Sequence, residues 1–266
     1  MKTIPLILIL SVLSGWSCKQ ANKEKVPFEA QKENWEPLFN GRNLDGWVAK
    51  ISGYPAGENF GNTFRVEDGI LQNNYDAYGD DFQSRFGHLF TEKEYSSYKL
   101  RAEYRFKGEA IKGAPEWAYL NNGIMIHAQS PETMQIDQWF PASVEVQLLA
   151  SDNQEIRTTG NVCTPGTAVR IDNEIYPDHC AASSSRTFPP DEWVTIEIVV
   201  YGDSLVHHIV QGDTVLTYTH LTLDGEGLNT ETPFIPGILN SGRIAIQSEG
   251  HPTEFRKIEI LDLSEK

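Results

Sequence analysis

A polar run near the C-terminus holds the densest group of side chains able to do acid, base or hydrogen-bond chemistry. Gln247 and Glu249 stand two residues apart, and His251 follows in a Gly-His-Pro turn. Glu254 and Arg256 come next, again two residues apart. Side chains alternate across a strand, so each pair shares one face if this region is extended. Alternating isoleucines on both sides of the turn predict a pair of strands joined there, with an unusual concentration of functional groups.

Two further segments place polar side chains on one face of a predicted strand. One strand carries Glu145 and Gln147 on the face opposite Val144, Val146 and Leu148. The other begins near Asn122 and carries His127 on the face opposite its two isoleucines. A single such residue is usually a solvated strand position. Their recurrence in three predicted strands favours the floor of a ligand cleft.

Three familiar chemistries can be compared with this pattern. Retaining glucanases on a jelly roll use a strand motif Glu-x-Asp-x-x-Glu, and only its first carboxylate is present, at Glu145. The Gly-x-Ser-x-Gly elbow of serine hydrolases does not occur in the sequence. Seven histidines are scattered without a His-x-x-x-His pair, so a metal signal is weak. A site that joins Glu145 to His127 or His251 in three dimensions stays open.

The elements that must position these residues are short strands. Val, Ile, Tyr and Phe dominate segments separated by turn residues, and no long segment has helical period. Turns at Gly202 and Gly212 are typical of hairpins. This pattern predicts an all-β fold, a two-sheet antiparallel sandwich or jelly roll. The expected strands are 63–66, 70–72, 88–90, 98–106, 123–128, 144–149, 193–201, 205–211, 215–220, 242–248 and 255–263.

Length and charge limit the classes of function. The chain has 266 residues and a formal net charge of -15, and it shows no basic stripe. Nucleic acid is therefore not expected as a partner, because binding to phosphates needs one. Aromatic residues make up 11% of the chain, which suffices for a core and suits a sugar-binding cleft.

The N-terminus is typical of an export signal. Lys2 precedes a short apolar stretch that is too short to span a membrane, so residues 1–17 are predicted to be a signal peptide. Cys18 follows a small residue, as in bacterial lipoproteins, and is the predicted lipid anchor. Residues 18–34 form the expected flexible tether and residues 35–266 a single β-sandwich domain. We expect a periplasmic or cell-surface lipoprotein attached to the membrane only through its lipid; ordinary secretion of a soluble protein is the alternative.

The two remaining cysteines are Cys163 and Cys180. In an oxidising compartment such a pair more often forms a disulfide than a metal site or a nucleophile. It would close the loop 164–179 and contribute roughly 3 kcal/mol in the chain-entropy model.

The chain resembles the 3-keto-disaccharide hydrolase domain family. The resemblance spans about residues 35–263 and rests on five stretches. They are Leu-Phe-Asn-Gly-Arg-Asn-Leu-Asp-Gly-Trp at 38–47, Asn-Gly-Ile-Met-Ile-His at 122–127, Ser-Val-Glu-Val-Gln-Leu-Leu at 143–149, Glu-Trp-Val-Thr at 192–195 and the Ile-Ala-Ile-Gln-Ser-Glu-Gly-His-Pro-Thr-Glu-Phe-Arg run at 244–256. It implies a concanavalin A-like jelly roll that acts on a 3-keto disaccharide or glycoside, with a separate sugar 3-dehydrogenase supplying the oxidised substrate.

A ketone at C3 acidifies the C2 proton, so the implied reaction is abstraction of that proton, elimination at C1 and, for net hydrolysis, addition of water. It needs a base, an acid and a group that stabilises the enolate.

The roles we expect on this basis are as follows. Glu145 or His127 is the candidate base, and His251 is the candidate acid. Gln147, Gln247, Arg256, Glu254 and Asn122 are the candidate substrate-binding residues. A divalent metal ion could act as Lewis acid for the enolate. Glu254 and Arg256 could instead form an ion pair with each other that braces the turn.

Two other functions remain open at this point. The same face could belong to a non-catalytic glycan-binding lipoprotein, or to a conventional glycoside hydrolase acting on unoxidised sugars.

Overall fold

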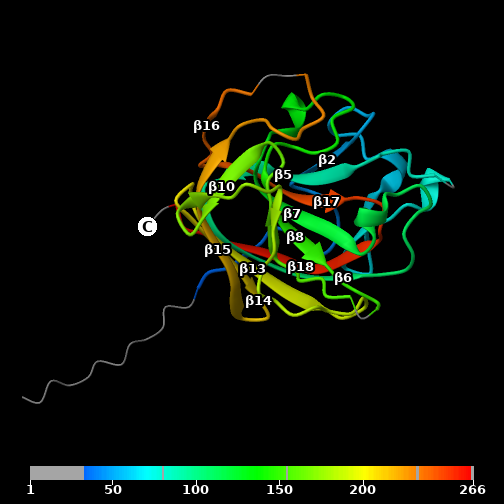
Figure 1. Cartoon of the computed structure of the whole chain (residues 1–266). Helices are drawn as coiled ribbons and strands as arrows, with labels where there is room; N and C mark the ends of the chain where they lie inside the picture. Colours follow the sequence, from blue (N-terminus) through cyan, green and yellow to red (C-terminus); the bar gives the residue numbers. More distant parts are fainter. Residues whose placement is uncertain (1–32, 80, 154, 232–233, 265–266) are drawn as a thin grey trace, which may run out of the picture. The chain divides into compact units, whose positions relative to one another are not determined.

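Two antiparallel β-sheets, packed face to face, make up the architecture in the computed structural model (Figure 1), which confirms the predicted all-β sandwich. The structure describes residues 33–79, 81–153, 155–231 and 234–264. The predicted signal peptide, Cys18 and most of the tether lie outside the described residues. In the part of the chain that is described, no helix has the length and apolar character needed to cross a membrane.

The smaller sheet has the strand order β12-β9-β8-β7-β17-β5-β2 within the described residues. These strands are β12 (Cys180–Ala181), β9 (Asn161–Cys163), β8 (Val144–Leu149), β7 (Asn121–Ala128), β17 (Gly242–Ser248), β5 (Gly87–Tyr95) and β2 (Trp47–Ile51).

The larger sheet has the order β11-β10-β15-β14-β13-β6-β18-β4-β3, with β1 beside β18 and β16 beside β15. Its strands are β11 (Glu174–Ile175), β10 (Thr167–Ile171), β15 (Asp213–Leu223), β14 (Leu205–Val210), β13 (Val194–Tyr201), β6 (Ser97–Phe106), β18 (Thr253–Asp262), β4 (Ile70–Asn73), β3 (Phe64–Glu67), β1 (Glu36–Pro37) and β16 (Gly237–Ile238). Single 3-10 turns lie at η1 (Phe60–Asn62), η2 (Asp76–Tyr78), η3 (Glu116–Ala118) and η4 (Pro131–Thr133).

Period-two alternation builds the core between the sheets. In β6 every second side chain is buried, and β8 turns its valines and Leu148 toward the same core. Each large apolar side chain that is fully buried contributes roughly 1.5–3 kcal/mol, so this face fixes the register of each strand. The opposite face of β8, which carries Glu145 and Gln147, is thereby directed away from the core, as predicted.

The predicted pairing of the two C-terminal strands is wrong. β17 belongs to the smaller sheet and β18 to the larger one, so the Gly-His-Pro turn crosses between the sheets. Both strands carry alternating isoleucines because each buries one face in the same core from opposite sides. Gly250 has φ 106°, a conformation that favours glycine, and it lets the chain leave one sheet for the other.

Candidate functional site

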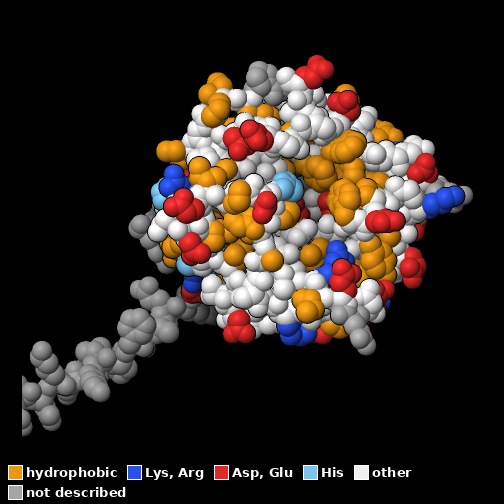
Figure 2. Space-filling view, viewed as in Figure 1, with side chains coloured by type: hydrophobic (Ala, Val, Ile, Leu, Met, Phe, Trp, Pro, Cys, Tyr) orange, Lys and Arg blue, Asp and Glu red, His pale blue; other side chains and the backbone are white. Residues whose placement is uncertain are grey.

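A cavity of about 630 Å³ lies over the outer face of the smaller sheet. Figure 2, in the view of Figure 1, shows hydrophobic side chains gathered on both sides of a hollow near the labels of β7, β8 and β17. The cavity has a polar floor and an aromatic wall. It is lined by Glu116, Trp117, Tyr119, Asn121, Phe140, Glu145, Gln147, Glu155, Arg157, Cys163, Pro165, His179, Cys180, Gly227 and Glu249.

Glu145 reaches the floor of the cavity from β8 and is only 7% exposed. Its side chain lies over Gly123 of the neighbouring strand β7: a Cβ atom at Gly123 would come within 2.8 Å of Glu145 Cγ and closer still to the carboxyl group. Gly123 therefore provides the space that Glu145 occupies. Burial raises the pKa of Glu145 to about 8, because the charged form is poorly solvated there.

Glu249 is a second buried carboxyl group in the cavity, and it follows β17 directly. It is 2% exposed, and its Oε2 atom has no hydrogen-bond partner. Burial raises the pKa of Glu249 well above its ordinary value, and the nearby charge of Glu145 raises it further. Because the charge of one carboxylate opposes ionisation of the other, the state with one proton on the pair is favoured over the doubly ionised state. In that state one carboxyl group is ionised and the other is protonated, as base and acid roles require.

We did not select Glu249 as a site residue from the sequence. Its spacing of two from Gln247 was the available signal, but the comparison with the glucanase motif looked for a second carboxylate on the strand of Glu145 alone. The structure brings the second carboxyl group from another strand of the same sheet.

A row of buried polar side chains crosses the smaller sheet beside these carboxyls. Lys50 and Gln247 both stand opposite His88, on neighbouring strands. Gln247 and His88 are fully buried, and neither their amide nor their ring atoms have a partner. Burial, and then the charge of Lys50, lowers the pKa of His88 to about 3, so this histidine is neutral. Gln247 does not line the cavity.

Gln147 does line the cavity, and a neighbour fixes its orientation. Asn161 of β9 stands opposite it and donates from Nδ2 to Gln147 Oε1 at 3.1 Å. With its oxygen occupied in this way, the amide nitrogen of Gln147 is the group left to donate to a ligand.

Arg157 brings a cationic group to the cavity. Its Nη1 atom donates to the carbonyl oxygens of Tyr119 at 2.7 Å and Ala150 at 3.0 Å, which holds the guanidinium group in place. The Tyr119 hydroxyl donates to Asp152 at 2.6 Å on the same side. Nothing in the sequence singles out Arg157, because it lies in a segment without strand periodicity.

Aromatic rings form one wall of the cavity. Trp117 and Phe140 line it, and both pack on the buried ring of Phe86, with centroid distances of 5.7 and 5.1 Å. Trp139 packs on the same ring at 5.2 Å but does not line the cavity. The rings of Trp117 and Phe86 are nearly parallel, with an angle of 7° between their planes, and Trp117 remains 51% exposed.

The opposite wall contains the disulfide between Cys163 and Cys180, which stand directly opposite each other on β9 and β12. His179 lies next to them, and these three residues are the group of possible metal ligands found within the described residues. Sulfur atoms in a disulfide are not thiolates, so this trio does not fit a metal ion in its oxidised state. Oxygen donors for a divalent ion in the cavity would come from Glu145 and Glu249.

His127 points away from the cavity, contrary to the predicted face. The ladder between β17 and β7 is irregular at this point, and His127 has φ 49°. This bulge turns the ring into the space between the sheets, where it packs edge-on against Tyr98 at 6.3 Å and contacts the carbonyl oxygen of Gly202 at 3.1 Å. Burial lowers its pKa. The structure does not bring His127 and Glu145 together in the cavity lining.

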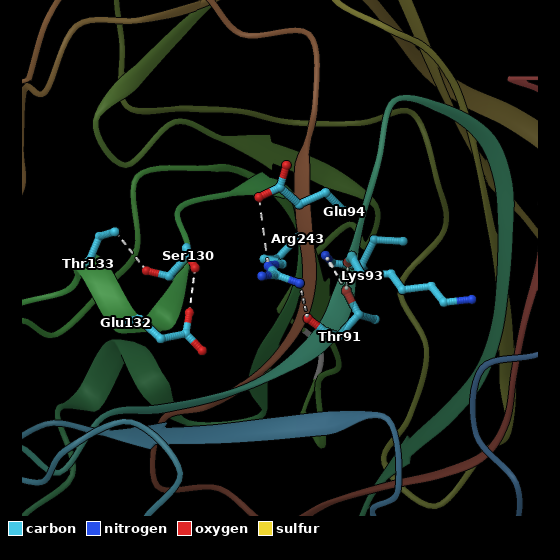
Figure 3. A network of polar contacts seen from close by, with 8 residues as sticks. Thr91, Lys93, Glu94, Ser130, Glu132, Thr133 and Arg243 are labelled. Carbon is cyan, nitrogen blue, oxygen red and sulfur yellow. Dashed lines mark hydrogen bonds and ion pairs between the residues drawn. The ribbon is translucent and has the colours of Figure 1, made fainter.

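Beyond this bulge, a separate polar network surrounds Arg243 of β17 (Figure 3). The guanidinium group lies 3.9 Å from Glu94 and 3.5 Å from the carbonyl oxygen of Thr91. Ser130 donates to Glu132 at 2.5 Å nearby. None of these residues lines the cavity over Glu145.

His251 and Asn122 are buried behind the cavity. The His251 ring packs edge-on against Tyr119 at 5.2 Å, and neither ring nitrogen has a partner. Burial lowers its pKa to about 4, so His251 is neutral near pH 7. Asn122 donates to the Gln247 carbonyl oxygen at 2.9 Å and to Thr253 Oγ1 at 3.2 Å, and it ties the two sheets together. Neither side chain lines the cavity.

Glu254 and Arg256 lie on the larger sheet and do not pair with each other. Glu254 binds Arg105 at 2.6 Å, and Arg256 pairs with Glu103, both partners on β6. A register shift in β18 at Arg256 separates the two positions. Arg256 also packs over the ring of Trp193 at 4.5 Å. The predicted ion pair between Glu254 and Arg256 is therefore wrong, and both residues bind across strands instead, outside the cavity lining.

Comparison with known proteins places this arrangement in a family. A search of curated proteins finds no match. Two solved structures, each described as a "putative glycosyl hydrolase" from Parabacteroides distasonis ATCC 8503, have a similar fold. The first has 19% identity and a TM-score of 0.51, and covers 86% of this chain and 94% of its own. The second has 18% identity and a TM-score of 0.50, and covers 86% of this chain and 100% of its own.

These likenesses establish the fold alone, whereas the family model compares the sequence itself. The model of the 3-keto-alpha-glucoside-1,2-lyase-like domain matches residues 34–261, nearly all of the part that follows the N-terminal segment. The resemblance noted from the sequence is thereby confirmed, and the family indicates a carbohydrate-processing domain. The chain belongs to the family of 3-keto-alpha-glucoside-1,2-lyase-like domains.

Proposed function

We propose that the protein cleaves 3-keto-glycosides by proton abstraction at C2 and elimination at C1. The observation that carries this proposal is the pair of buried carboxyl groups, Glu145 and Glu249, in one sugar-sized cavity. Burial raises the pKa of both groups, and the charge of one opposes ionisation of the other, which favours a state with one carboxylate and one carboxylic acid. A base and an acid are what the elimination needs, on adjacent carbon atoms of one ring.

The proposed step assigns one proton transfer to each carboxyl group. Glu145 takes the proton from C2, and the electrons of the C–H bond form an enolate with the C3 ketone. The enolate then expels the C1 oxygen, to which Glu249 gives its proton, so the products are an alcohol and a 1,2-unsaturated 3-keto sugar. Addition of water across C1 and C2 would complete a net hydrolysis. Gln147 and Arg157 supply N–H donors for the enolate oxygen or for ring hydroxyls.

A divalent ion, if bound, would supply Lewis-acid stabilisation of the enolate oxygen. The carboxylates of Glu145 and Glu249 would be its ligands. Gln147 and Arg157 would orient the ring in either case.

The test uses a 3-keto disaccharide in deuterated water, with and without a chelator. The wild type should release the leaving sugar and incorporate deuterium at C2. Glu145→Gln should lose both signals, because it removes the base. Glu249→Gln should retain C2 exchange but release the leaving group more slowly, because only the acid is lost. Near-wild-type rates in both variants would overturn the assignment.

The sequence alone offered only one carboxylate for a conventional glycoside hydrolase. Glu249 adds a second carboxyl group to the cavity, so that function becomes a second candidate. That function predicts turnover of unoxidised disaccharides without exchange at C2. Binding of either sugar without any product would instead indicate a glycan-binding protein. The same incubation distinguishes all three.

We further infer a lipid-anchored position in the cell envelope and a sugar 3-dehydrogenase that supplies the ketone. Radiolabelled-lipid incorporation that depends on Cys18 would test the anchor.

A further inference from the structure

We propose that Trp117 forms the binding surface for the leaving group, so that the preferred substrate is a disaccharide rather than a glycoside of a small alcohol. This inference rests on the proposed function and names the second half of its substrate. It starts from an unusual feature of the aromatic wall. A large tryptophan ring lines the cavity and is half exposed, yet it is held rigidly by packing.

The packing of Trp117 leaves one ring face for a ligand. Its ring lies nearly parallel to that of Phe86, which is itself 2% exposed and packed against Phe82 at 5.0 Å and Phe140 at 5.1 Å. The Trp117 carbonyl oxygen also accepts from Asn121 Nδ2 at 3.1 Å, which fixes the backbone to the start of β7. A ring held in this way loses little conformational freedom when a ligand stacks on it.

Trp117 and Glu145 line the same cavity and are both connected to the start of β7. The carboxyl group of Glu145 lies over Gly123, and Asn121, which holds Trp117, is two residues along the same strand. Two strand residues span about 7 Å. In the orientation that we propose, the C2 proton of the reacting ring faces Glu145 and its C1 substituent lies toward the aromatic wall.

The chemistry of the wall also fits a sugar. C–H groups on the flat face of a pyranose carry partial positive charge, and the face of an indole ring is negative, so the two attract while water is excluded. At about 630 Å³ the cavity falls within the range of pockets that enclose extended ligands, about 300–1,000 Å³. It has room for a second ring beside the reacting one.

The fold supplies a matched control in Trp139. This residue packs on the same Phe86 ring and is 39% exposed, but it does not line the cavity. Its replacement removes the same ring from the same aromatic cluster without touching the proposed surface.

The experiment compares kcat/KM of the wild type, Trp117→Ala, Trp117→Phe and Trp139→Ala. The substrates are a 3-keto disaccharide and the methyl 3-keto-glucoside, which shares only the reacting ring. Trp117→Ala should lower kcat/KM for the disaccharide about tenfold, mainly through KM, and change the methyl glycoside less than about threefold. Trp117→Phe should restore much of the loss, and Trp139→Ala should change neither value. Equal losses on both substrates, or no loss on the disaccharide, would overturn the proposal.

A binding measurement separates this inference from the proposed function. Equilibrium dialysis of the wild type and Trp117→Ala with an unoxidised disaccharide and with methyl glucoside needs no turnover. If no 3-keto substrate is cleaved but the disaccharide binds in a Trp117-dependent way, the proposed reaction fails and the stacking surface stands. If binding of both sugars is unaffected by Trp117→Ala, the stacking surface fails whatever the activity.

Discussion

Replacing Glu145 with Gln should remove the part of the pH dependence of stability that this carboxyl group contributes. The side chain is 7% exposed, and burial raises its pKa from an ordinary 4.5 to about 8. The folded protein therefore holds a proton on Glu145 at pH values where the unfolded chain has released it. By linkage, stability is greatest when the carboxyl group is protonated in both states, and it declines as the pH rises from about 4.5 to about 8.

The magnitude follows from the shift. Each pKa unit corresponds to about 1.4 kcal/mol, so the full effect is roughly 5 kcal/mol. Roughly 4 kcal/mol of this loss of stability falls between about pH 5 and about pH 9, because the unfolded carboxyl group is already largely ionised at the lower pH. Glutamine keeps the shape of the side chain and does not titrate. The stability of the variant relative to wild type should therefore rise by about 4 kcal/mol between about pH 5 and about pH 9.

Urea unfolding followed by tryptophan fluorescence at several pH values would measure the difference. Glu174→Gln removes the same charge from an exposed position in β11, and its curve should run parallel to that of the wild type. If the curves of Glu145→Gln and wild type also ran parallel within about 1 kcal/mol, Glu145 would not be a buried, proton-holding carboxyl group. The assignment of Glu145 as a base with a raised pKa would then fail.

Three further changes test other parts of the structure. Gly123→Ala should lower kcat by about tenfold or more while the thermal midpoint changes little, because its methyl group displaces the flexible Glu145 carboxyl rather than the backbone; an unchanged kcat would contradict the close approach. Cys163→Ser with Cys180→Ser should destabilise the protein by roughly 3 kcal/mol in denaturant unfolding, since the closed loop has a sequence separation of 17; unfolded wild type with two reactive thiols would refute the disulfide. His127→Ala should cost about 1–3 kcal/mol of stability through the lost packing and hydrogen bond. Its kcat/KM should stay within about threefold of wild type, and a complete loss in folded protein would return His127 to the site.

Alternation of apolar residues predicted the sandwich because a strand that buries one face repeats that face every two residues. The long strands β6, β8, β13 and β17 follow this rule and lie where the sequence placed them. Short strands such as β9 do not, since two or three residues contain no period to detect. Pairing is also invisible in the pattern: the segments on either side of His251 alternate equally well whether they join one sheet or two.

Side-chain direction within the site failed where the backbone departs from regular pleating. A single bulge turned His127 to the other face, and a register shift in β18 separated Glu254 from Arg256. No proline or glycine stands at His127 or Arg256 that would indicate either irregularity in the sequence. Glu145 and Gln147 were placed correctly because β8 is regular throughout. The sequence therefore located a strand's polar face reliably only where the ladder beside it is unbroken.

The number of carboxyl groups does not decide between elimination and ordinary glycoside hydrolysis, but their protonation does favour one. A carboxylate nucleophile must be ionised before the substrate arrives, and hydrolases keep it so with hydrogen bonds or a nearby cation. Within the described part of the chain, neither Glu145 nor Glu249 forms an ion pair, and burial raises the pKa of both carboxyl groups. Neither group therefore has the support that a glycosidase nucleophile receives. Removal of a carbon acid's proton needs one ionised carboxylate, and a raised pKa makes that carboxylate a stronger base, while the partner that stays protonated is ready to meet the departing oxygen.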